Sequence, residues 1–328
     1  MRKVLLATTA LATIGGVAAI ANADVSLSGD QQWRYISLSD DNNADNSDSD
    51  FTAETNVYIA FSTTTDNGLT FSMSQSFDED GVTENTSSIS GDFGTISFVD
   101  GSTTAHAASD FDVTSVGIAG GHGDAGMVGY AGTSGTTTIS GVQYNEALIR
   151  DPDGGGVLRY HSPSFGGLTF GVSFGHLEDG DDNTSTSYGA MYSGSMGDIG
   201  YKIGVASYDG QGSSEDGQHI GANITYGDMT FGIGSSSNKT SATSKQEDLS
   251  YSVNYKMNSD LTLNIGRATS ENDNGGTKLE ANNTSIGVAY TIAPGLTATL
   301  NSHNFEYKSG GSVANDGQAI QSEIKMSW

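Results

Sequence analysis

Cysteine is absent from the chain, and only 3 of its 328 residues are proline. Without cysteine the fold has no disulfide, no thiol nucleophile and no thiolate metal site. Nor does any segment after residue 23 approach the roughly 18 apolar residues of a membrane helix, and apolar residues at helical spacing are hard to find. The stability of this protein must therefore come from hydrogen bonding and burial in a structure that is not built on membrane helices.

Basic residues are also scarce, with 13 Lys and Arg against 39 Asp and Glu. All 39 acids follow residue 23, whereas Arg2 and Lys3 precede it, so residues 24–328 carry 39 acids against 11 bases, a formal charge of −28. A field of this sign repels nucleic acid and gathers cations. A nucleic-acid partner is excluded on this ground.

The first 23 residues differ in composition from the rest of the chain. Arg2 and Lys3 precede an apolar run from Val4 to Ile20, and the small residues Ala21 and Ala23 flank Asn22. This pattern predicts a cleaved signal peptide with Asp24 as the first mature residue. A transmembrane anchor is the alternative, but the apolar run is interrupted by threonine and glycine and no stop-transfer charges follow it.

The overall composition is unusual for a folded chain of this length: 35% of residues are hydrophobic, 45 are glycine, and the mean hydropathy is −0.31. A disordered acidic chain is one interpretation. The 14 Tyr, 12 Phe and 2 Trp argue against it, because disordered segments are depleted in aromatic residues. A β-barrel with one lipid face and one watery face explains both observations, since only every second strand residue must then be apolar.

Apolar residues recur with period two along most of the chain, which is the spacing of side chains on one face of a strand. At the C-terminus Ile320, Ile324 and Met326 share one face, and Gln321, Glu323 and Lys325 share the other. The same alternation recurs in 57–61, 69–73, 168–174, 199–205, 220–226, 229–233, 249–257, 261–265, 286–292 and 296–300.

Charged residues in these segments fall on the polar face, as expected where a Lys or Arg toward the bilayer midplane costs about 2 to 4 kcal/mol. Arg267 is the exception, and we interpret it as lying where its strand runs out into a loop. A soluble β-sandwich would alternate in the same way, so the connections must decide between the two folds.

Short and long connections alternate, as in outer-membrane barrels. The short ones are 64–68, 91–94, 162–167, 194–198, 226–228, 257–260 and 293–295, and polar stretches lie between them at 39–50, 78–85, 178–185, 209–217, 238–247, 271–280 and 308–317. With the long connection at 100–156, seven turns and eight loops predict sixteen strands. Residues 24–328 are thus expected to form a single all-β domain, a transmembrane antiparallel up-and-down β-barrel wide enough for a water-filled lumen.

Residues 100–156 do not fit this order of strands and connections. They contain many glycines, and apolar and polar residues seldom alternate in them. One interpretation is an unusually long surface loop. We favour a third outer loop folded into the lumen, because a structureless stretch of this length calls for a functional reason. Its acids would then line the pore constriction: Asp110, Asp112, Asp124 and Glu146.

Four local motifs resemble the sixteen-stranded general diffusion porins of Gram-negative bacteria, most closely the alphaproteobacterial ones. They are the first strand Val25–Asp30, the turns Thr65–Leu69 and Ser90–Thr95, and the Ser-Pro-x-Phe-x-Gly turn within Ser162–Leu168. In that turn the proline stands outside the strand ladder, where its missing N–H does no harm.

The resemblance implies a multi-pass homotrimer in the outer membrane, in contact with lipid and lipopolysaccharide. It also implies that acidic residues of the third loop face basic residues across each pore. Lumen parity makes Arg34, Arg159, Lys202 and Lys256 the candidates for the opposing wall. The family ends in an aromatic residue, usually Phe, that the barrel-assembly machinery reads, and Trp328 stands at that position here.

The sequence therefore predicts a non-enzymatic porin that lets ions and small hydrophilic solutes diffuse through a cation-selective channel. A substrate-specific channel of the same fold is the main alternative, although most aromatic residues have lipid parity. An outer-membrane barrel enzyme is less favoured, since the six histidines show no repeated spacing with Ser or Asp. No cofactor is expected, and the acidic stretch 40–50 is a candidate Ca²⁺ site only because hard cations prefer clustered carboxylates.

Overall fold

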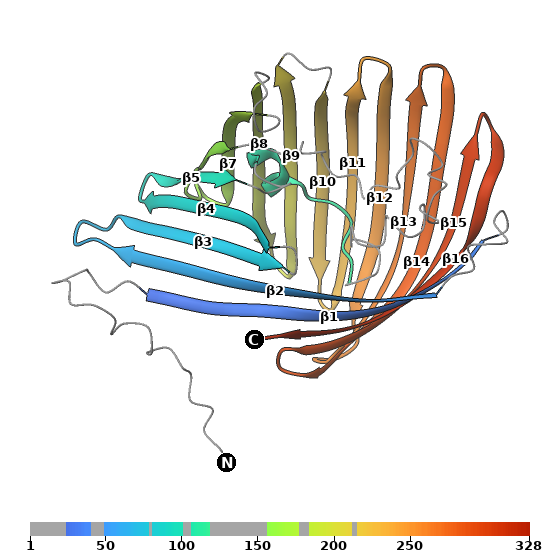
Figure 1. Ribbon diagram of the computed structural model, residues 1–328, viewed down its shortest axis with the longest axis horizontal. Helices are drawn as coiled ribbons and strands as arrows, with labels where there is room; N and C mark the ends of the chain where they lie inside the picture. The colour runs from blue at the N-terminus through green and yellow to red at the C-terminus, as the bar shows by residue number, and fades with distance from the viewer. Residues whose placement is uncertain are drawn as a thin grey trace.

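The computed structural model describes residues 24–40, 49–78, 81–100, 106–118, 156–176, 184–211 and 215–328. The predicted signal peptide, 1–23, lies outside these ranges. In the described residues, sixteen antiparallel strands close into one barrel, with β16 paired to β1 (Figure 1). No helix within those ranges is both long and apolar enough to cross a membrane. The predicted all-β barrel and its strand number are confirmed.

The strands follow one another around the barrel in chain order. Their bounds are β1 (Asp24–Asp40), β2 (Ser49–Thr64), β3 (Thr70–Asp78), β4 (Gly81–Gly91), β5 (Gly94–Asp100), β6 (Val157–His161), β7 (Leu168–His176), β8 (Thr184–Met196), β9 (Ile199–Gln211), β10 (Asp216–Tyr226), β11 (Met229–Ser241), β12 (Ser244–Lys256), β13 (Leu261–Asn274), β14 (Thr277–Ala293), β15 (Leu296–Ser309) and β16 (Ser312–Ser327).

The two faces of the wall differ as the period-two pattern predicts. Large apolar side chains such as Phe231, Tyr251 and Ile265 point outward and are exposed. Small and polar side chains such as Ser252 and Asn264 point inward. Because successive strand residues alternate between faces, a single chain provides both a lipid-facing surface and a polar lumen.

All seven predicted short turns join strands in the structure. At the opposite end of the barrel, four of the expected long loops are wrong: 78–85, 238–247, 271–280 and 308–317 lie mostly within strands, and β11–β12, β13–β14 and β15–β16 are joined by two residues each. We call the end with the seven short turns the turn end and this opposite end the outer end.

Glycine explains two of these tight hairpins. Gly275 and Gly276 have φ values of 63° and 97°, and Gly310 and Gly311 have values of 59° and 83°. Two successive positive φ angles match the right-handed twist of the flanking strands, so the ladder continues to the last residue before the turn. The polar residues that suggested loops are strand residues with hydrophilic side chains on both faces.

This extension also corrects the interpretation of Arg267. Arg267 lies inside β13, paired with Tyr251 of β12 and Thr284 of β14, and the strand continues for seven residues beyond it. Its side chain has outward parity and is exposed. Arg267 is therefore an outward-facing cation on a strand rather than a loop residue.

The barrel closes at the seam between β1 and β16. The backbone N–H of Trp328 donates to the carbonyl oxygen of Gly29 at 3.0 Å, and the N–H of Gly29 donates to the carbonyl of Trp328 at 3.2 Å. A Cβ on Gly29 would lie 2.5 Å from the indole Cζ2 and 2.6 Å from the carbonyl oxygen of Asn56. The C-terminal indole thus occupies a place that only glycine leaves open.

Gly29→Val should hinder this closure, because the added side chain displaces the indole at a cost of about 1 to 3 kcal/mol. We expect a lower refolding yield and a lower thermal unfolding midpoint, followed by circular dichroism and by the mobility of unheated protein on a gel. Leu27→Val is the control, since Leu27 shares that face of β1 and is 67% exposed. If the two variants refold with the same yield and unfold at the same temperature, the proposed packing of the Trp328 indole against Gly29 is wrong.

Candidate pore constriction

Residues 106–118, which belong to the connection between β5 and β6, lie inside the barrel. They begin with a short 3₁₀ helix, η1 (Ala107–Phe111), and continue as an extended segment to Ile118. The helix packs on β7, β8 and β9, and the extended segment crosses the strands that follow (Figure 1). We call residues 106–118 the lumen segment. Its position confirms that the third outer loop folds inward.

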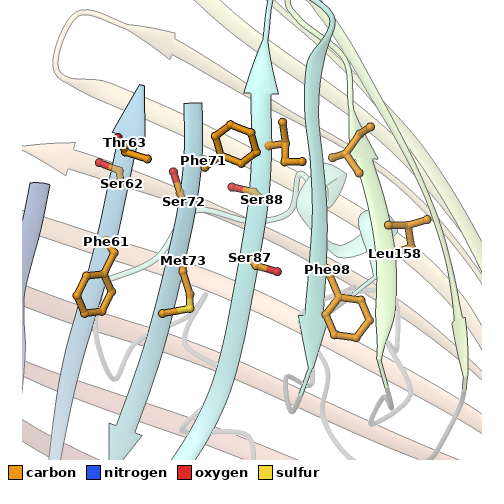
Figure 2. Close-up of a pocket in the computed structure, with 12 residues that line it drawn as sticks. Phe61, Ser62, Thr63, Phe71, Ser72, Met73, Ser87, Ser88, Phe98 and Leu158 are labelled. Carbon is orange, nitrogen blue, oxygen red and sulfur yellow. The ribbon is translucent and has the colours of Figure 1, made fainter. Parts of the chain in front are cut away.

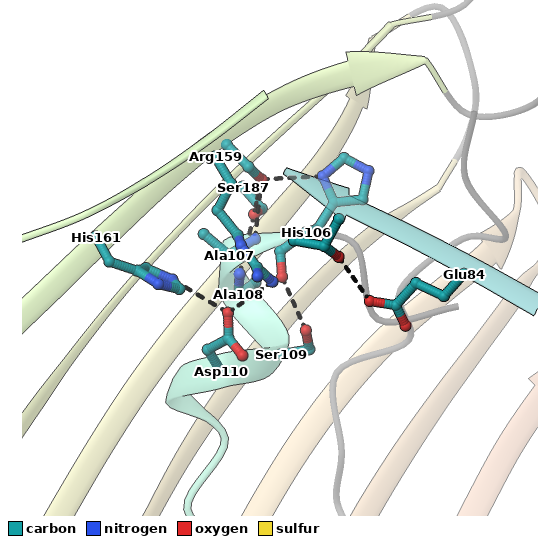
Figure 3. A network of polar contacts seen from close by, with 11 residues as sticks. Glu84, His106, Ala107, Ala108, Ser109, Asp110, Arg159, His161 and Ser187 are labelled. Atoms are coloured by element: carbon teal, nitrogen blue, oxygen red, sulfur yellow. Dashed lines mark hydrogen bonds and ion pairs between the residues drawn. The ribbon is translucent and has the colours of Figure 1, made fainter. Parts of the chain in front are cut away.

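Three serines of the wall anchor the first residues of the lumen segment. Ser173 on β7 accepts from the N–H of Ala107, and Ser187 on β8 accepts from the N–H of Ala108, each at 3.0 Å (Figure 3). The ring of His106 lies between Ser173 and Ser185, with Nδ1 3.0 Å from one hydroxyl and Nε2 2.9 Å from the other. The free N–H groups at the start of the helix therefore find partners on the wall.

His106 is fully buried and meets the edge of the Tyr208 ring at a centroid distance of 5.5 Å. Burial, with a smaller contribution from the nearby Arg159 guanidinium, lowers the pKa of His106 to about 4. The imidazole is therefore neutral at physiological pH, and its two ring nitrogens link the lumen segment to the serine hydroxyls of the wall.

The second half of the lumen segment is held through its backbone. His219 Nε2 on β10 lies 3.1 Å from both the amide nitrogen and the carbonyl oxygen of Val113. The carbonyl of Val116 accepts from Ser252 Oγ at 2.5 Å and from Asn264 Nδ2 at 3.0 Å. These backbone contacts explain how one wall can hold an irregular segment in a fixed path.

Glycines on the inner wall leave room for this path. A Cβ on Gly204 would collide with the carbonyl oxygen of Phe111, and one on Gly221 would collide with that of Val113. Further glycines meet the segment in the same way: Gly189, Gly232, Gly234 and Gly287. This feature was not predicted from the sequence, although glycines at lumen parity in successive strands are a signal for a chain packed against them.

The predicted constriction acids separate into two environments. The carboxylate of Asp110 is 41% exposed, and its Oδ2 lies 3.0 Å from Arg159 Nη1 and 3.1 Å from His161 Nε2 (Figure 3). Asp112 is almost fully covered, with Oδ1 3.8 Å from His219 Nδ1. Asp124 and Glu146 lie outside the described residues, as does 41–48 of the acidic first loop.

The predicted basic residues do not gather on one opposing wall. Arg159 lies beside Asp110 rather than across from it. Lys202 lies on the inward face of β9, two residues nearer the turn end than Gly204. Lys256 lies on the inward face of β12, two residues nearer the turn end than Asn254. Within the described ranges no carboxylate lies within 4 Å of either lysine ammonium group.

Of the four predicted cations, Arg34 alone lies on the far side of the lumen from η1. It is on β1, and β1 is eight strands from β9, on which η1 packs, in a sixteen-strand circle. Its guanidinium contacts Glu323 at 2.5 Å, Gln32 at 2.6 Å and Glu54 at 3.9 Å. Asp30 and Lys325 pair at 3.4 Å on the same wall. This wall therefore holds three carboxylates against two cations.

The described residues contain no group of three His, Cys, Asp or Glu side chains arranged to hold a metal ion. Their chemistry is that of a polar, hydrogen-bonded passage narrowed by a docked segment, with one exposed carboxylate at the constriction. Comparison with known proteins bears on this directly: the family model described as Gram-negative porin matches residues 7–310.

The chain belongs to the Gram-negative porin family. Family and fold together establish a channel of the bacterial outer membrane, and they point to a non-enzymatic one. None of the curated proteins compared with the chain matches it in sequence.

Solved structures show the same fold at low sequence identity. OmpT of Vibrio cholerae is 14% identical, with a TM-score of 0.66 over 96% of this chain and 100% of OmpT. An anion-selective porin from Comamonas acidovorans is 14% identical, with a TM-score of 0.62 over 93% and 100%. A double mutant of the Rh. blastica porin is 17% identical, with a TM-score of 0.61 over 93% and 100%.

Gly204→Val should displace the lumen segment, since the valine side chain would occupy the place of Phe111 O and Val113 at a cost of about 1 to 3 kcal/mol. We expect faster hydrogen exchange at the amides of residues 106–118, measured by mass spectrometry. Gly200→Val is the matched control on the same strand and face, where the nearest atom to an added Cβ is 3.8 Å away. If the amides of residues 106–118 are equally protected from exchange in Gly204→Val, the conclusion that the wall glycines make room for the lumen segment is wrong.

Acid should weaken the docking of the lumen segment. The docked form holds His106 with a pKa of about 4, whereas an undocked histidine titrates near its ordinary value of about 6.5. The undocked form therefore binds the proton first, and docking loses stability as pH falls from 6.5 towards 4.

The amide hydrogen exchange of Ala107 and Ala108, corrected for the intrinsic exchange rate, should become faster as the pH falls from 6.5 towards 4. His106→Gln should remove this dependence, because glutamine does not titrate, and a dependence that persists in the variant would assign it to another group.

Proposed function

We propose that this porin is a passive, non-enzymatic channel with a preference for cations, through which ions and small hydrophilic solutes diffuse. The observation that carries the proposal is the exposed carboxylate of Asp110 on a segment docked inside a sixteen-strand barrel. A charge that projects into a narrow, water-filled passage changes the local concentration of ions that must pass it.

The far wall supports a preference for cations. Its arginine, Arg34, already contacts Glu323 and Glu54, so the far wall adds little positive charge to that of Arg159, which lies beside Asp110. Lys202 and Lys256 act in the other direction and moderate the preference. The family does not decide the sign of selectivity, since the Comamonas relative is described as anion-selective.

Non-specific diffusion is favoured over a substrate-specific channel by the position of the inward aromatic side chains. Phe305, Tyr307 and Tyr208 have inward parity but are at most 5% exposed, so a sugar in the lumen does not reach them. Tyr58 is the accessible one among the inward-facing aromatics of the described strands, with 40% exposure. A row of accessible aromatic rings, as a sugar pathway needs, is not present in those strands.

A homotrimer is supported by the outer face of β2–β6. β5 has seven residues and β6 five, fewer than the about 9 to 11 that a tilted strand needs to cross a bilayer. An apolar hollow of about 500 Å³ lies on this face, lined by Phe61, Phe71, Met73, Phe98 and Leu158 (Figure 2). A neighbouring copy of the chain would cover this part of the wall, whose strands β5 and β6 are too short to span the bilayer. One solved form of OmpT is described as a trimer.

The remaining parts of the proposal concern export and assembly. Residues 1–23 act as the cleaved export signal, and the strand that ends at Trp328 is read by the barrel-assembly machinery. The exposed indole, 54% accessible at the end of β16, is consistent with recognition before the seam closes. Contacts with outer-membrane lipid and lipopolysaccharide follow from the apolar outer face.

Refolded residues 24–328 should conduct in a planar bilayer, in steps that occur in threes, and give a cation-selective zero-current potential in a low-salt KCl gradient. Asp110→Asn should shift that potential towards anions, because Arg159 then loses its counter-charge. The difference should fade between 0.1 M and 1 M salt as the Debye length falls from about 10 Å to about 3 Å.

Asp66→Asn, in an exposed turn between β2 and β3, is the control for net charge alone and should leave the potential unchanged. A potential that favours anions in the unmodified protein would overturn the cation preference. A barrel that inserts without conducting would overturn the channel itself, and blockage by one sugar would favour the specific-channel alternative.

A further inference from the structure

The apolar band on the outside of β9–β16 has a sharp upper edge. On each strand an outward large apolar side chain is followed, two residues nearer the outer end, by a polar one, and only on β16 does a further exposed apolar side chain, Val313, lie beyond it. The apolar members are Val205, Ile220, Ile233, Leu249, Ile265, Ile286, Leu300 and Ile320, and the polar members are Ser207, Gln218, Ser235, Glu247, Arg267, Thr284, Ser302 and Gln318.

The strand register shows that this edge is continuous. Ile220 pairs with Val205 on one side and Ser235 on the other, and Ile286 pairs with Ile265 and Ser302. From one strand to the next the edge stays level or steps by two residues in either direction, except between β12 and β13, where Ile265 lies four residues lower than Leu249. We call these eight first polar positions the polar ring. It is an uneven band, and we place it at the outer boundary of the hydrocarbon region because large apolar side chains lie below it on every strand.

Arg267 is the only cation in that ring. It stands directly above Ile265 on β13, between Tyr251 and Thr284 of the neighbouring strands. An arginine at this depth keeps its aliphatic stem against apolar surface while its guanidinium reaches the headgroup layer. The position avoids the cost of burying the charge in lipid and places it where headgroup phosphates lie.

The other outward cations of β9–β16 each have a carboxylate partner within the chain. Lys239 pairs with Asp216 at 3.6 Å, Lys245 with Glu247 at 2.6 Å, and Lys308 with Glu306 at 2.6 Å. Lys278 contacts both Glu271 and Glu280 at 3.1 Å. Among the described residues, no carboxylate lies within 4 Å of the Arg267 guanidinium, although the chain has three times as many acids as bases.

We propose that Arg267 binds a headgroup phosphate of the phosphorylated glycolipid that forms the outer leaflet. This inference rests on the proposed function, because it requires the barrel to stand in the outer membrane with β9–β16 facing lipid. The guanidinium fork matches phosphate oxygens in a bidentate geometry. A protein with so much negative charge repels an anionic leaflet, and a cation at headgroup depth with no carboxylate beside it in the described residues provides a local attachment point.

The binding test uses refolded residues 24–328 in neutral detergent, titrated with lipid A that carries both phosphates. Bound lipid is counted by native mass spectrometry, and the thermal unfolding midpoint is followed in parallel. Arg267→Gln should weaken lipid A binding about tenfold or more, the usual loss for a charge-assisted hydrogen bond. Arg267→Lys should recover part of it, since it restores the charge without the fork.

Lys239→Gln is the matched control, because it removes an outward cation that already has a partner, and it should bind lipid A as the unmodified protein does. Lipid A freed of both phosphates should bind equally to all variants, and inorganic phosphate should give no stabilisation at the same concentration. Circular dichroism without lipid checks that each variant is folded.

Equal binding of lipid A to Arg267→Gln and to the unmodified protein would overturn the inference, as would an equal loss in Lys239→Gln, which would indicate general charge attraction. Conductance of the unmodified protein separates this result from the proposed function. A protein that conducts but does not distinguish phosphorylated from dephosphorylated lipid A retains its channel and loses the headgroup site.

Discussion

The structure depends on the requirement that backbone polar groups within a membrane be hydrogen-bonded inside the protein. A sheet meets this requirement only if it closes, since an open edge would leave a row of N–H and C=O groups in hydrocarbon. Here closure is completed by the pairing of β1 with β16 and extended by the reciprocal hydrogen bonds between Gly29 and Trp328. The last residue of the chain is therefore part of the seam.

Closure of sixteen strands creates a lumen too wide for the wall side chains to fill. The lumen segment narrows this space, and its irregular backbone needs partners as much as any strand does. The wall supplies them through Ser173, His219, Ser252 and Asn264, and the glycines at lumen parity bring the two backbones close together. The same inward face thus serves stability and sets the charge that a passing ion meets.

Period two along the chain predicted strands with one apolar and one polar face, because the bilayer imposes one polarity on each face of every strand. The alternation of short and long connections then favoured a barrel over a sandwich. Turn positions were predictable because six of the seven short connections contain glycine or proline, which tight turns favour. The outer end was less predictable. Residues 271–280 have the composition of a loop, yet they pair as strands, because above the bilayer both faces of a hairpin meet water and hydrophilic side chains carry no directional signal. Arg267 was misplaced for the same reason.

The sequence by itself determined the class of fold, the number of strands, the polarity of each face and the inward course of the third loop's first part, since each follows from local periodicity or from connection length. Only the tertiary structure decided which charges meet. Asp110 joins Arg159 and His161, Arg34 joins Glu323 and Glu54, and Arg267 has no carboxylate beside it in the described residues. Such pairings depend on the register between strands and on the path of the lumen segment, which bring together residues that are up to 289 positions apart in the chain.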